Sequence, residues 1–578
     1  MRMGNKSRLA RRIIGVPVAV AAVAALLVGC SDSDPEPSAV TDEAASGGTV
    51  RVLSSASAFV SLDPQRVYTT LEANVSNLIT RTLTTFQTTS DGESKLVGDL
   101  AEGTGKPSKD KKTWTFKLRE GIKWETGSAI TCEDIRYGVL RSFDAVSDEP
   151  VITGGSPYPM DWLDVDSKYR GPKADGTGDV GGVTCTNDST IRFDLRKPIG
   201  NFPSATSLTS FAPVPKNNDT WEEYGDDPVS SGPYVLDTYQ PADDDDKGSA
   251  VFVRNPHFDS KTDDVREAKP DKIVFNFGID RDYAASQLIA DNPEYANAVL
   301  FEDVPQTYIQ QVLNDDELGA RTVSDSGSSV SYLAINSRKV SDVKCRQALR
   351  YAFNKRKYME VSGGELSGMY ATTMLAPNDP AHKDHDTYDL ADAPQGNLDR
   401  AKELLAGNEC PTELVLDVAD SEESLTKAET IVTTYGRLGI TVKTNAIPPE
   451  EYYTQISQPD EQHDLAVAGW APDWPGGSGI MPALFDGDLI KDGINSNFSL
   501  LDDTEINERI DEASVEADPD KAHEMWGQLD ADISELAVTV PISFNKITVL
   551  CGSNIRGASL SPRWDEIDLA SLGTADGT

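Results

Sequence analysis

The stretch TELVLDVADSEESLTKAETIVTTYGRLGITVKTNAIPPEEYYTQISQPDEQHDLAVAGW, residues 412–470, determines the class of fold. Three of its segments have the length and composition of strands, namely 412–420, 440–447 and 464–470. Residues 425–439 have the spacing of a helix, and EYYTQI begins a second helix. Strands that alternate with helices pair in parallel through right-handed crossovers. This part of the chain therefore predicts an α/β fold.

The rest of the chain contains predicted strands in which apolar and polar residues alternate. Segments with a strand pattern occur at 113–124, 190–195, 231–240, 249–258, 271–279 and 538–550. A helix is predicted from TCEDIRYGVLRSFD, because Thr131 and Asp134 have the spacing of a capping box. About 530 residues follow the leader and the linker described below, which is too many for one hydrophobic core. We therefore expect more than one compact unit.

The N-terminus resembles a secretory signal peptide. Five basic residues and no acids precede the apolar run IIGVPVAVAAVAALLVG, and LVGC then resembles a lipobox. We predict a signal peptide at 1–29, a lipidated Cys30, and a disordered acidic linker over 30–48. A transmembrane anchor is the alternative, but the run is shorter than the roughly 20 residues needed to span a bilayer. Sec and twin-arginine export both remain open.

The charge of the chain excludes some partners. The formal net charge is −41, and removal of 1–29 makes the mature chain more negative by five charges. Phosphate contacts need clustered lysine and arginine, so we expect no nucleic-acid binding.

The sequence lacks the common catalytic and metal-binding motifs G-x-S-x-G, H-E-x-x-H and C-x-x-C. We therefore expect neither an enzyme nor a cofactor. His382 and His385 form H-x-x-H, but a solvated acidic loop is favoured over a metal site.

Five cysteines remain after Cys30 is assigned to a lipid. Export permits disulfides, and an odd number leaves one thiol outside the intramolecular bridges. Among the arrangements that five cysteines allow, we expect Cys132–Cys185 and Cys345–Cys410, with Cys551 free.

Several motifs together resemble one family. In chain order they are LREGIKWETGSAITCEDIRYGVLRSF, SGPYVLDTY, VRNPHF, YLAINSRK, CRQALRYAFNKR and DLAVAGWAPDWP, within residues 49–560. They resemble the extracellular solute-binding proteins of ABC importers, in the class with oligopeptide-, dipeptide- and nickel-binding members (family 5). The resemblance implies a two-lobed, type II periplasmic-binding-protein-like α/β fold with a hinge. Lobe 1 would comprise 49–279, with an extra subdomain, and 539–578; lobe 2 would be 280–538, and the crossings would lie at DKIVFNFGI and VTVPISF.

The segment AGWAPDWPGG, residues 468–477, is the candidate site. It follows a strand of the predicted parallel set, at the sheet edge where open α/β sheets bind ligands. Trp470 and Trp474 offer apolar walls, and Asp473 offers a charge to a ligand amine. The resemblance implies that Asp473 receives the α-amino group of a peptide. The alternative is that the indoles are core residues and Asp473 caps a turn.

Two further residues follow the first strand of the chain. The resemblance implies that Ser57 and Phe59 approach the ligand, although an ordinary loop would have the same composition. No arginine could be matched to the carboxylate of a peptide ligand.

We therefore expect a monomeric lipoprotein, anchored on the outer side of the cell membrane, that captures a peptide. It would deliver the peptide to a membrane permease and ATPase of an ABC importer. Oligosaccharide and metal-chelate receptors are alternatives of the same class. A secreted hydrolase and a surface lipoprotein without a ligand are alternatives of other classes.

Overall fold

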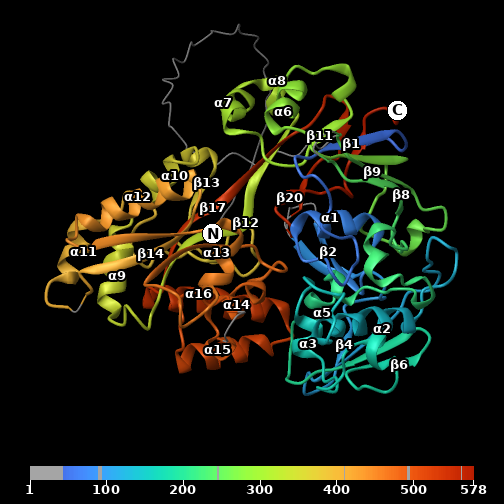
Figure 1. The fold of residues 1–578 in the computed structure, drawn as a ribbon, viewed down its shortest axis with the longest axis horizontal. Helices are drawn as coiled ribbons and strands as arrows, with labels where there is room; N and C mark the ends of the chain where they lie inside the picture. The colour runs from blue at the N-terminus through green and yellow to red at the C-terminus, as the bar shows by residue number, and fades with distance from the viewer. Residues whose placement is uncertain (1–42, 89–93, 244–245, 409, 491–494, 562) are drawn as a thin grey trace, which may run out of the picture. The chain divides into compact units, whose positions relative to one another are not determined.

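The structure is a computed structural model that describes residues 43–578 apart from 89–93, 244–245, 409, 491–494 and 562 (Figure 1). The predicted signal peptide, Cys30 and most of the predicted linker lie outside the described residues. The last residues of that linker are ordered, since Ala45 N donates to Thr574 O over 2.8 Å and Gly47 N donates to Lys269 O over 2.8 Å. No helix in the described part is long and apolar enough to span a membrane.

A five-stranded sheet with the order β11-β1-β10-β9-β8 forms the centre of the first lobe. Its strands are β1 (Thr49–Leu53), β8 (Tyr234–Gln240), β9 (Ser249–Arg254), β10 (Lys272–Asn276) and β11 (Ala298–Leu300). β1 pairs in parallel with β10 and β11, whereas β9 pairs antiparallel with its two neighbours. Helix α1 (Thr70–Ile79) buries Val75, Leu78 and Ile79 in the core that covers this sheet.

The first lobe also carries the expected extra subdomain. Its antiparallel sheet has the order β4-β5-β7-β6, formed by Lys106–Pro107, Thr113–Lys117, Thr190–Asp194 and Val183–Asn187. Helix α2 (Cys132–Arg141) begins where the sequence predicts, because Thr131 N donates to the Asp134 carboxylate over 2.8 Å. The short helix α3 (Tyr158–Trp162) packs its aromatic side chains against the same core.

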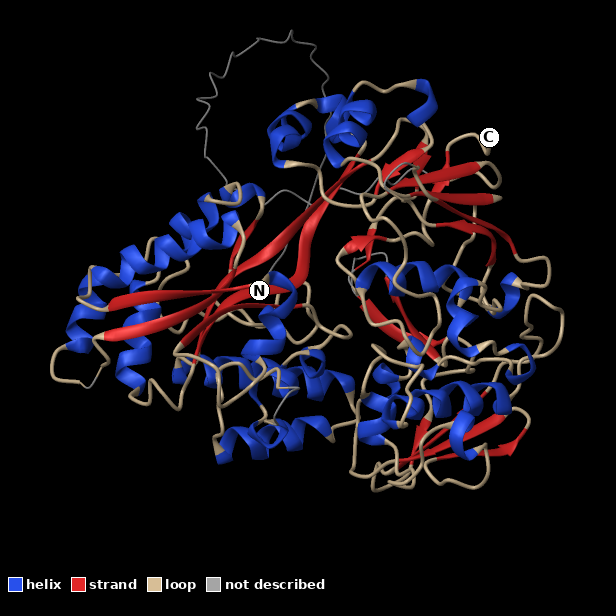
Figure 2. Cartoon of the chain, in the orientation of Figure 1, coloured by secondary structure: helices blue, strands red, loops and turns tan. Residues whose placement is uncertain are grey.

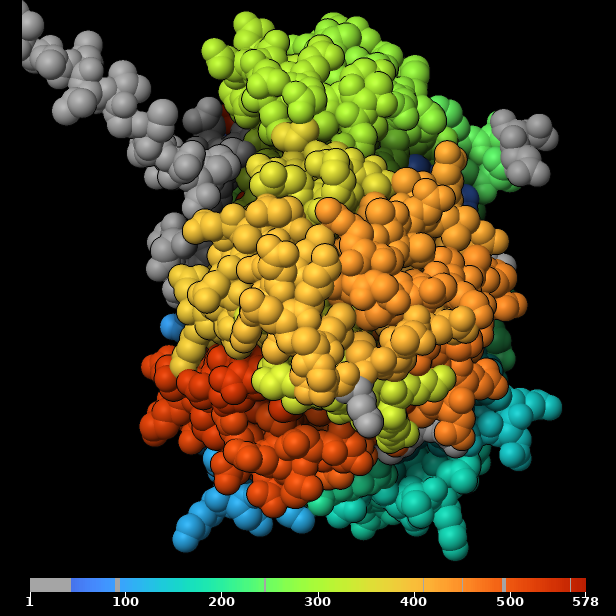
Figure 3. Space-filling view, turned by 90° about the vertical axis from the view of Figure 1, so that its left-hand side faces the viewer, coloured from blue at the N-terminus to red at the C-terminus, as the bar shows by residue number. Residues whose placement is uncertain are grey.

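A six-stranded sheet with the order β13-β17-β12-β16-β14-β15 forms the second lobe (Figure 2). Its strands are β12 (Thr322–Ile335), β13 (Gly368–Tyr370), β14 (Glu413–Ala419), β15 (Thr441–Ile447), β16 (Leu465–Trp470) and β17 (Thr539–Leu550). β14 pairs in parallel with β15 and β16, as the alternation of strands with α12 (Glu422–Gly436) and α13 (Pro449–Ile456) predicts. Figure 3 shows one face of this lobe, where yellow and orange segments form a continuous surface beside the red-orange helices.

Of the two chain segments expected to cross between the lobes, the one at 271–279 lies within the first lobe instead. β12 and β17 lie side by side over most of their length, and their register shifts between Ser326 and Val330 (Figure 1). The segment 271–279 does not cross, because β10 and the following β11 both pair with β1 in the first sheet. A buried strand pattern is the same in either sheet, so the sequence could not assign this strand to a lobe.

The disulfides link secondary structure within each lobe. Cys132 on α2 pairs with Cys185 on β6, and Cys345 on α9 (Val343–Ala352) pairs with Cys410. Cys551 is a buried free thiol. This pairing is the one expected from the sequence.

Removing the subdomain bridge with Cys132→Ser and Cys185→Ser together should lower the free energy of unfolding by about 2–5 kcal/mol. The bridge joins residues 53 apart, and its loss releases that loop in the unfolded chain. Urea unfolding followed by tryptophan fluorescence measures the change. Cys551→Ala is the control, because it removes a buried thiol but no crosslink and should cost about 1 kcal/mol. Equal losses in the two proteins would contradict a stabilising crosslink.

Candidate ligand-binding site

The loop after β16 is held by the second lobe. Gly476 has a φ of 111°, which glycine adopts without a steric penalty, and its N–H donates to the Asp379 carboxylate over 3.1 Å. Asp379 is itself buried and also accepts from Ala381 N over 2.7 Å. Pro472 is buried, so the chain on both sides of Asp473 is constrained.

Asp473 meets two phenols of the first lobe. The Tyr68 hydroxyl donates to its carboxylate over 2.7 Å, and the Tyr158 hydroxyl donates to the other carboxylate oxygen. Tyr68 lies just before α1, and Tyr158 opens α3 in the extra subdomain. A side chain of the second lobe therefore binds two separate elements of the first lobe.

The environment of Asp473 disfavours its charged form. Burial raises the pKa of Asp473, while the hydrogen bonds from Tyr158 and Tyr68 and the charge of Arg563 lower it. Burial and the nearby carboxylate raise the pKa of both tyrosines, so they remain hydrogen-bond donors at neutral pH. A cation at this place would offset the cost of burying the carboxylate.

Asp473 lines a cavity of about 120 Å³ between the lobes. The second lobe supplies Ala471–Asp473, and the first lobe supplies the beginning of α1, residues 207–209, Arg266, Arg563 and Trp564. A larger cavity of about 750 Å³ adjoins it and shares Asn77, Thr85, Arg266, Arg563 and Trp564. The two spaces therefore meet at the arginine side chains.

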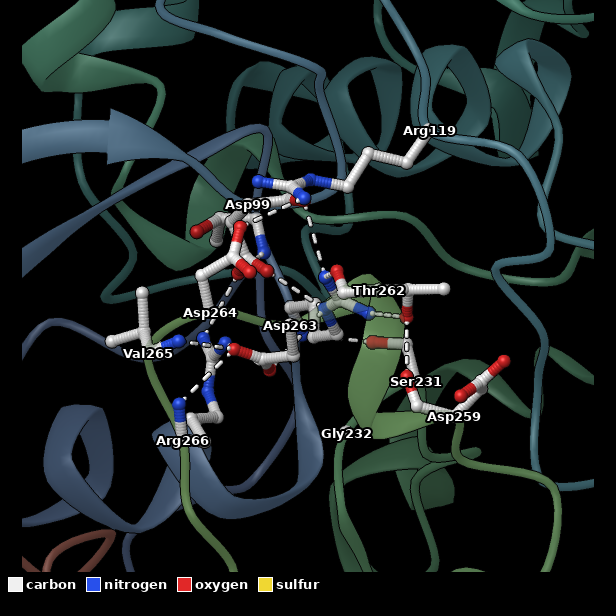
Figure 4. A network of polar contacts seen from close by, with 12 residues as sticks. Asp99, Arg119, Ser231, Gly232, Asp259, Thr262, Asp263, Asp264, Val265 and Arg266 are labelled. Atoms are coloured by element: carbon white, nitrogen blue, oxygen red, sulfur yellow. Dashed lines mark hydrogen bonds and ion pairs between the residues drawn. The ribbon is translucent and has the colours of Figure 1, made fainter.

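The two arginines of the cavity differ in how their donors are used. Arg266 Nη1 pairs with Asp263 and Nη2 pairs with Asp99, each over 2.9 Å, and its Nε donates to Asn77 O over 2.8 Å (Figure 4). Arg563 donates from Nη2 to Ser207 O over 2.8 Å, but its buried Nε has no hydrogen-bond partner among the described residues. Neither arginine was predicted as a site residue, because neither lies in a sequence pattern that indicates a cavity.

A family model described as bacterial extracellular solute-binding proteins, family 5 Middle, matches residues 95–491. The chain belongs to family 5. The dipeptide-binding protein of Escherichia coli (strain K12) is 23% identical over 586 residues, with 97% of each chain covered. The oligopeptide-binding protein OppA of Bacillus subtilis (strain 168) is 21% identical over 464 residues, covering 78% of this chain and 80% of that protein. The solved structure of clavulanic acid biosynthesis oligopeptide binding protein 2 is 29% identical, with a TM-score of 0.83 and coverage of 92% and 96%.

These matches confirm the predicted family and the two-lobed α/β fold. Family 5 is a family of solute-binding proteins rather than enzymes. Within the described residues, no group of three His, Cys, Asp or Glu side chains could hold a metal ion.

In this family 5 protein, Trp474 does not line the cavity but is a core residue. It is 1% exposed, and its ring centroid lies 5.0 Å from that of Tyr158 and 6.1 Å from that of Trp162. The indole thus enters the apolar core of the extra subdomain, although its backbone belongs to the second lobe. Burial of an indole among aromatic rings is favourable, which explains why Trp474 is not left as a wall of the cavity.

The other three predicted contacts also lie away from the two cavities. Trp470 is partly buried against the second-lobe core, and its Nε1 donates to Gly479 O over 3.3 Å. Phe59 is 6% exposed and packs on Tyr239 and Phe277 in the first-lobe core, because its loop folds back onto the sheet. Ser57 is exposed, and its carbonyl accepts from Ala242 N over 2.7 Å. Of the predicted residues, Asp473 is the one that lines the cavity between the lobes.

Proposed function

We propose that the protein captures a short peptide between its lobes, by the peptide's α-amino group, and delivers it to the permease of an ABC importer. The observation that supports this most is that Asp473 lines a cavity to which the second lobe contributes Ala471–Asp473 and the first lobe contributes the other lining residues. Relatives along most of the chain are named as dipeptide- and oligopeptide-binding proteins. The basic leader, the apolar run and Cys30 support a lipid anchor on the outer side of the membrane.

The chemistry of Asp473 suits an ammonium group. A carboxylate offers about four lone-pair sites, and the two phenols of Tyr68 and Tyr158 use two of them. An ammonium could take the remaining sites and also donate to the phenol oxygens. In a cavity with little water, its attraction to the carboxylate is stronger than at an open surface. A ligand that touches residues of both lobes stabilises the closed form.

Asp473→Ala should weaken the binding of peptides with a free α-amino group by about 10- to 100-fold, as expected for loss of a charged hydrogen-bond partner. N-acetylated forms of the same peptides lack the ammonium, so the variant should change their affinity little. Isothermal titration of the domain that begins at residue 43 measures both. The peptides are chosen by mass spectrometry of what the wild-type domain captures from a defined dipeptide and tripeptide mixture.

Asp460→Ala is the matched control, because Asp460 is an exposed acid of the same lobe and lines neither cavity. Its affinities should equal those of the wild type. An equal loss for free and acetylated peptides in Asp473→Ala would refute the role of Asp473. Capture of no peptide in any form would refute peptide binding itself.

A further inference from the structure

The two strands that cross between the lobes, β12 and β17, pass from one hydrophobic core to the other at the same place. On β12, Val323 belongs to the first-lobe core and Val330 to the second-lobe core. On β17, Ile547 and Phe544 divide in the same way. The register of the two strands shifts at this point, and β12 has extra residues there. A bulge of this kind bends a strand and interrupts its ladder of hydrogen bonds. Residues 327–329 are therefore the irregular part of the crossing.

One carboxylate, that of Asp565, binds this irregular segment. The Ser328 N–H and hydroxyl donate to its Oδ1 over 2.7 and 2.9 Å. The Ser329 N–H and hydroxyl donate to its Oδ2 over 2.8 and 2.6 Å. Backbone N–H groups that leave a strand ladder need another acceptor, and hydrogen bonds to a carboxylate are stronger than those to a neutral oxygen. Asp565 therefore replaces the strand ladder where the crossing is irregular.

Two local features allow Asp565 to reach the crossing. Asp565 has a φ of 53°, in the left-handed region that aspartate adopts more readily than most other residues. A Cβ atom on Gly327 would lie 2.7 Å from Asp565 Oδ2 and 2.7 Å from Ile547 Cδ1. Only glycine at position 327 leaves room for the carboxylate, so the two positions are matched to each other.

The hairpin that carries Asp565 belongs to the first lobe. It consists of β19 (Leu560–Ser561) and β20 (Glu566–Ile567), and Ile567 is buried in the first-lobe core. Asn74 Nδ2, on α1, donates to Ile567 O over 2.7 Å. Since the beginning of α1 lines the cavity between the lobes, the hairpin connects that cavity to the crossing strands.

A cavity of about 230 Å³ lies at the crossing, and Asp565 lines it together with Asn545 and Lys546 of β17. Protein interiors are close-packed, so a cavity at this place lets the crossing strands shift without displacing other groups. We propose that Asp565 is a clasp on the hinge: it holds residues 327–329 in the conformation of the closed protein, and the lobes open when it is released. The clasp is made within the chain itself, so it acts whether or not a ligand is present.

Asp565→Gly tests the clasp in the ligand-free protein. The variant removes the carboxylate but keeps a residue that adopts the left-handed conformation without strain. The amides of Ser328 and Ser329 should exchange with solvent about 10- to 100-fold faster than in the wild type, because they lose a charged acceptor. Hydrogen exchange of peptides that cover 322–335, followed by mass spectrometry, measures this change. Small-angle X-ray scattering should show a larger radius of gyration, because the closed form loses population.

Gly327→Ala tests the same clasp from the other strand, because the added methyl group displaces the carboxylate, and it should reproduce both changes. Asp389→Gly is the matched control. Asp389 is also an aspartate with a positive φ, 52°, but it is exposed in the second lobe and lines none of the cavities described above. It should exchange and scatter like the wild type. If Asp565→Gly does not fold, Asp565→Asn replaces it; this variant keeps one acceptor oxygen and should show the same changes at a smaller size.

Ligand affinity distinguishes a released clasp from a lost ligand contact. Asp565→Gly should bind the dipeptide Ala-Ala about 5- to 50-fold more weakly than the wild type, because apparent affinity falls with the population of the closed form. Its preference for the free over the N-acetylated dipeptide should stay that of the wild type, since Asp473 is unchanged.

Wild-type exchange rates at Ser328 and Ser329 in Asp565→Gly would overturn the clasp. Faster exchange with an unchanged radius of gyration would also overturn it, because Asp565 would then serve only the hydrogen bonds of the bulge. Binding of Ala-Ala by neither protein would count against the proposed function alone, and the two ligand-free measurements would still decide whether Asp565 is a clasp.

Discussion

Asp99→Asn should lower the free energy of unfolding by about 3–5 kcal/mol, which is the usual cost of leaving a buried charge without its partner. The Asp99 carboxylate pairs with Arg81 Nε over 2.7 Å and with Arg266 Nη2 over 2.9 Å. All three side chains are at most 2% exposed. An asparagine keeps the shape of the side chain but leaves two buried guanidinium groups to share Asp263 alone.

Asp263 cannot compensate for this loss. Burial raises the pKa of Asp263, but the charges of Arg266 and Arg81 outweigh that effect and hold it at about 2. The pKa of Asp263 in the folded protein is below its value of about 3.9 in the unfolded chain. Its contribution to the free energy of unfolding is therefore fully present above about pH 3.9 and is lost as the pH falls toward 2. At neutral pH Asp263 is therefore already charged and paired with Arg266 over 2.9 Å. No further negative charge is available from it.

Asp264→Asn is the control within the same network (Figure 4). Asp264 pairs with Arg119 over 3.0 Å, but its side chain is 68% exposed. Exposed pairs contribute about 0–1 kcal/mol, so this variant should unfold almost like the wild type. Urea unfolding at neutral pH, followed by circular dichroism, compares the three proteins. A change below 1 kcal/mol for Asp99→Asn would show that the buried ion pairs do not stabilise the lobe.

The sequence predicted those features of the fold that depend on local pattern. The parallel pairing of β14 with β15 and β16 follows from strands and helices that alternate within one short stretch. The start of α2 follows from the spacing of Thr131 and Asp134. The crossing at β12 was missed, because strand periodicity indicates burial but does not identify the neighbouring strand.

In the candidate site, too, some residues could be predicted from local sequence pattern and others depend on tertiary structure. Asp473 was predicted from its place at the end of a parallel strand together with the family resemblance, and the structure places it at the cavity between the lobes. Arg563 could not be found in this way, since it reaches the cavity from a segment near the C-terminus that carries no motif. Trp474 was assigned to the correct loop, but only tertiary structure shows that its indole is buried in the core of the other lobe. The sequence pattern indicates that a tryptophan is buried, but it does not indicate in which core the side chain lies.

Trp474→Ala should shift the ligand-free protein toward an open form and weaken ligand binding. Truncation of a buried tryptophan costs about 3–5 kcal/mol, and here the indole and the core that surrounds it belong to different lobes. The loss therefore acts on the contact between the lobes rather than on the interior of either. Apparent affinity falls in proportion to the population of the closed form, so a reduction of about 100-fold or more is expected. Small-angle X-ray scattering should show a larger radius of gyration, and titration with Ala-Ala should show the lower affinity.

Trp124→Ala distinguishes closure from general destabilisation. Trp124 is 2% exposed in the same subdomain core, but its backbone belongs to the lobe that forms this core. It should lower stability by a similar amount and leave the radius of gyration unchanged. Other contacts also join the lobes; for example, Gly200 N donates a hydrogen bond to Ser514 O over 2.7 Å. These contacts limit how far one substitution can open the protein. If Trp474→Ala lowers stability but scatters like Trp124→Ala, those contacts suffice for closure and the indole serves only the subdomain core.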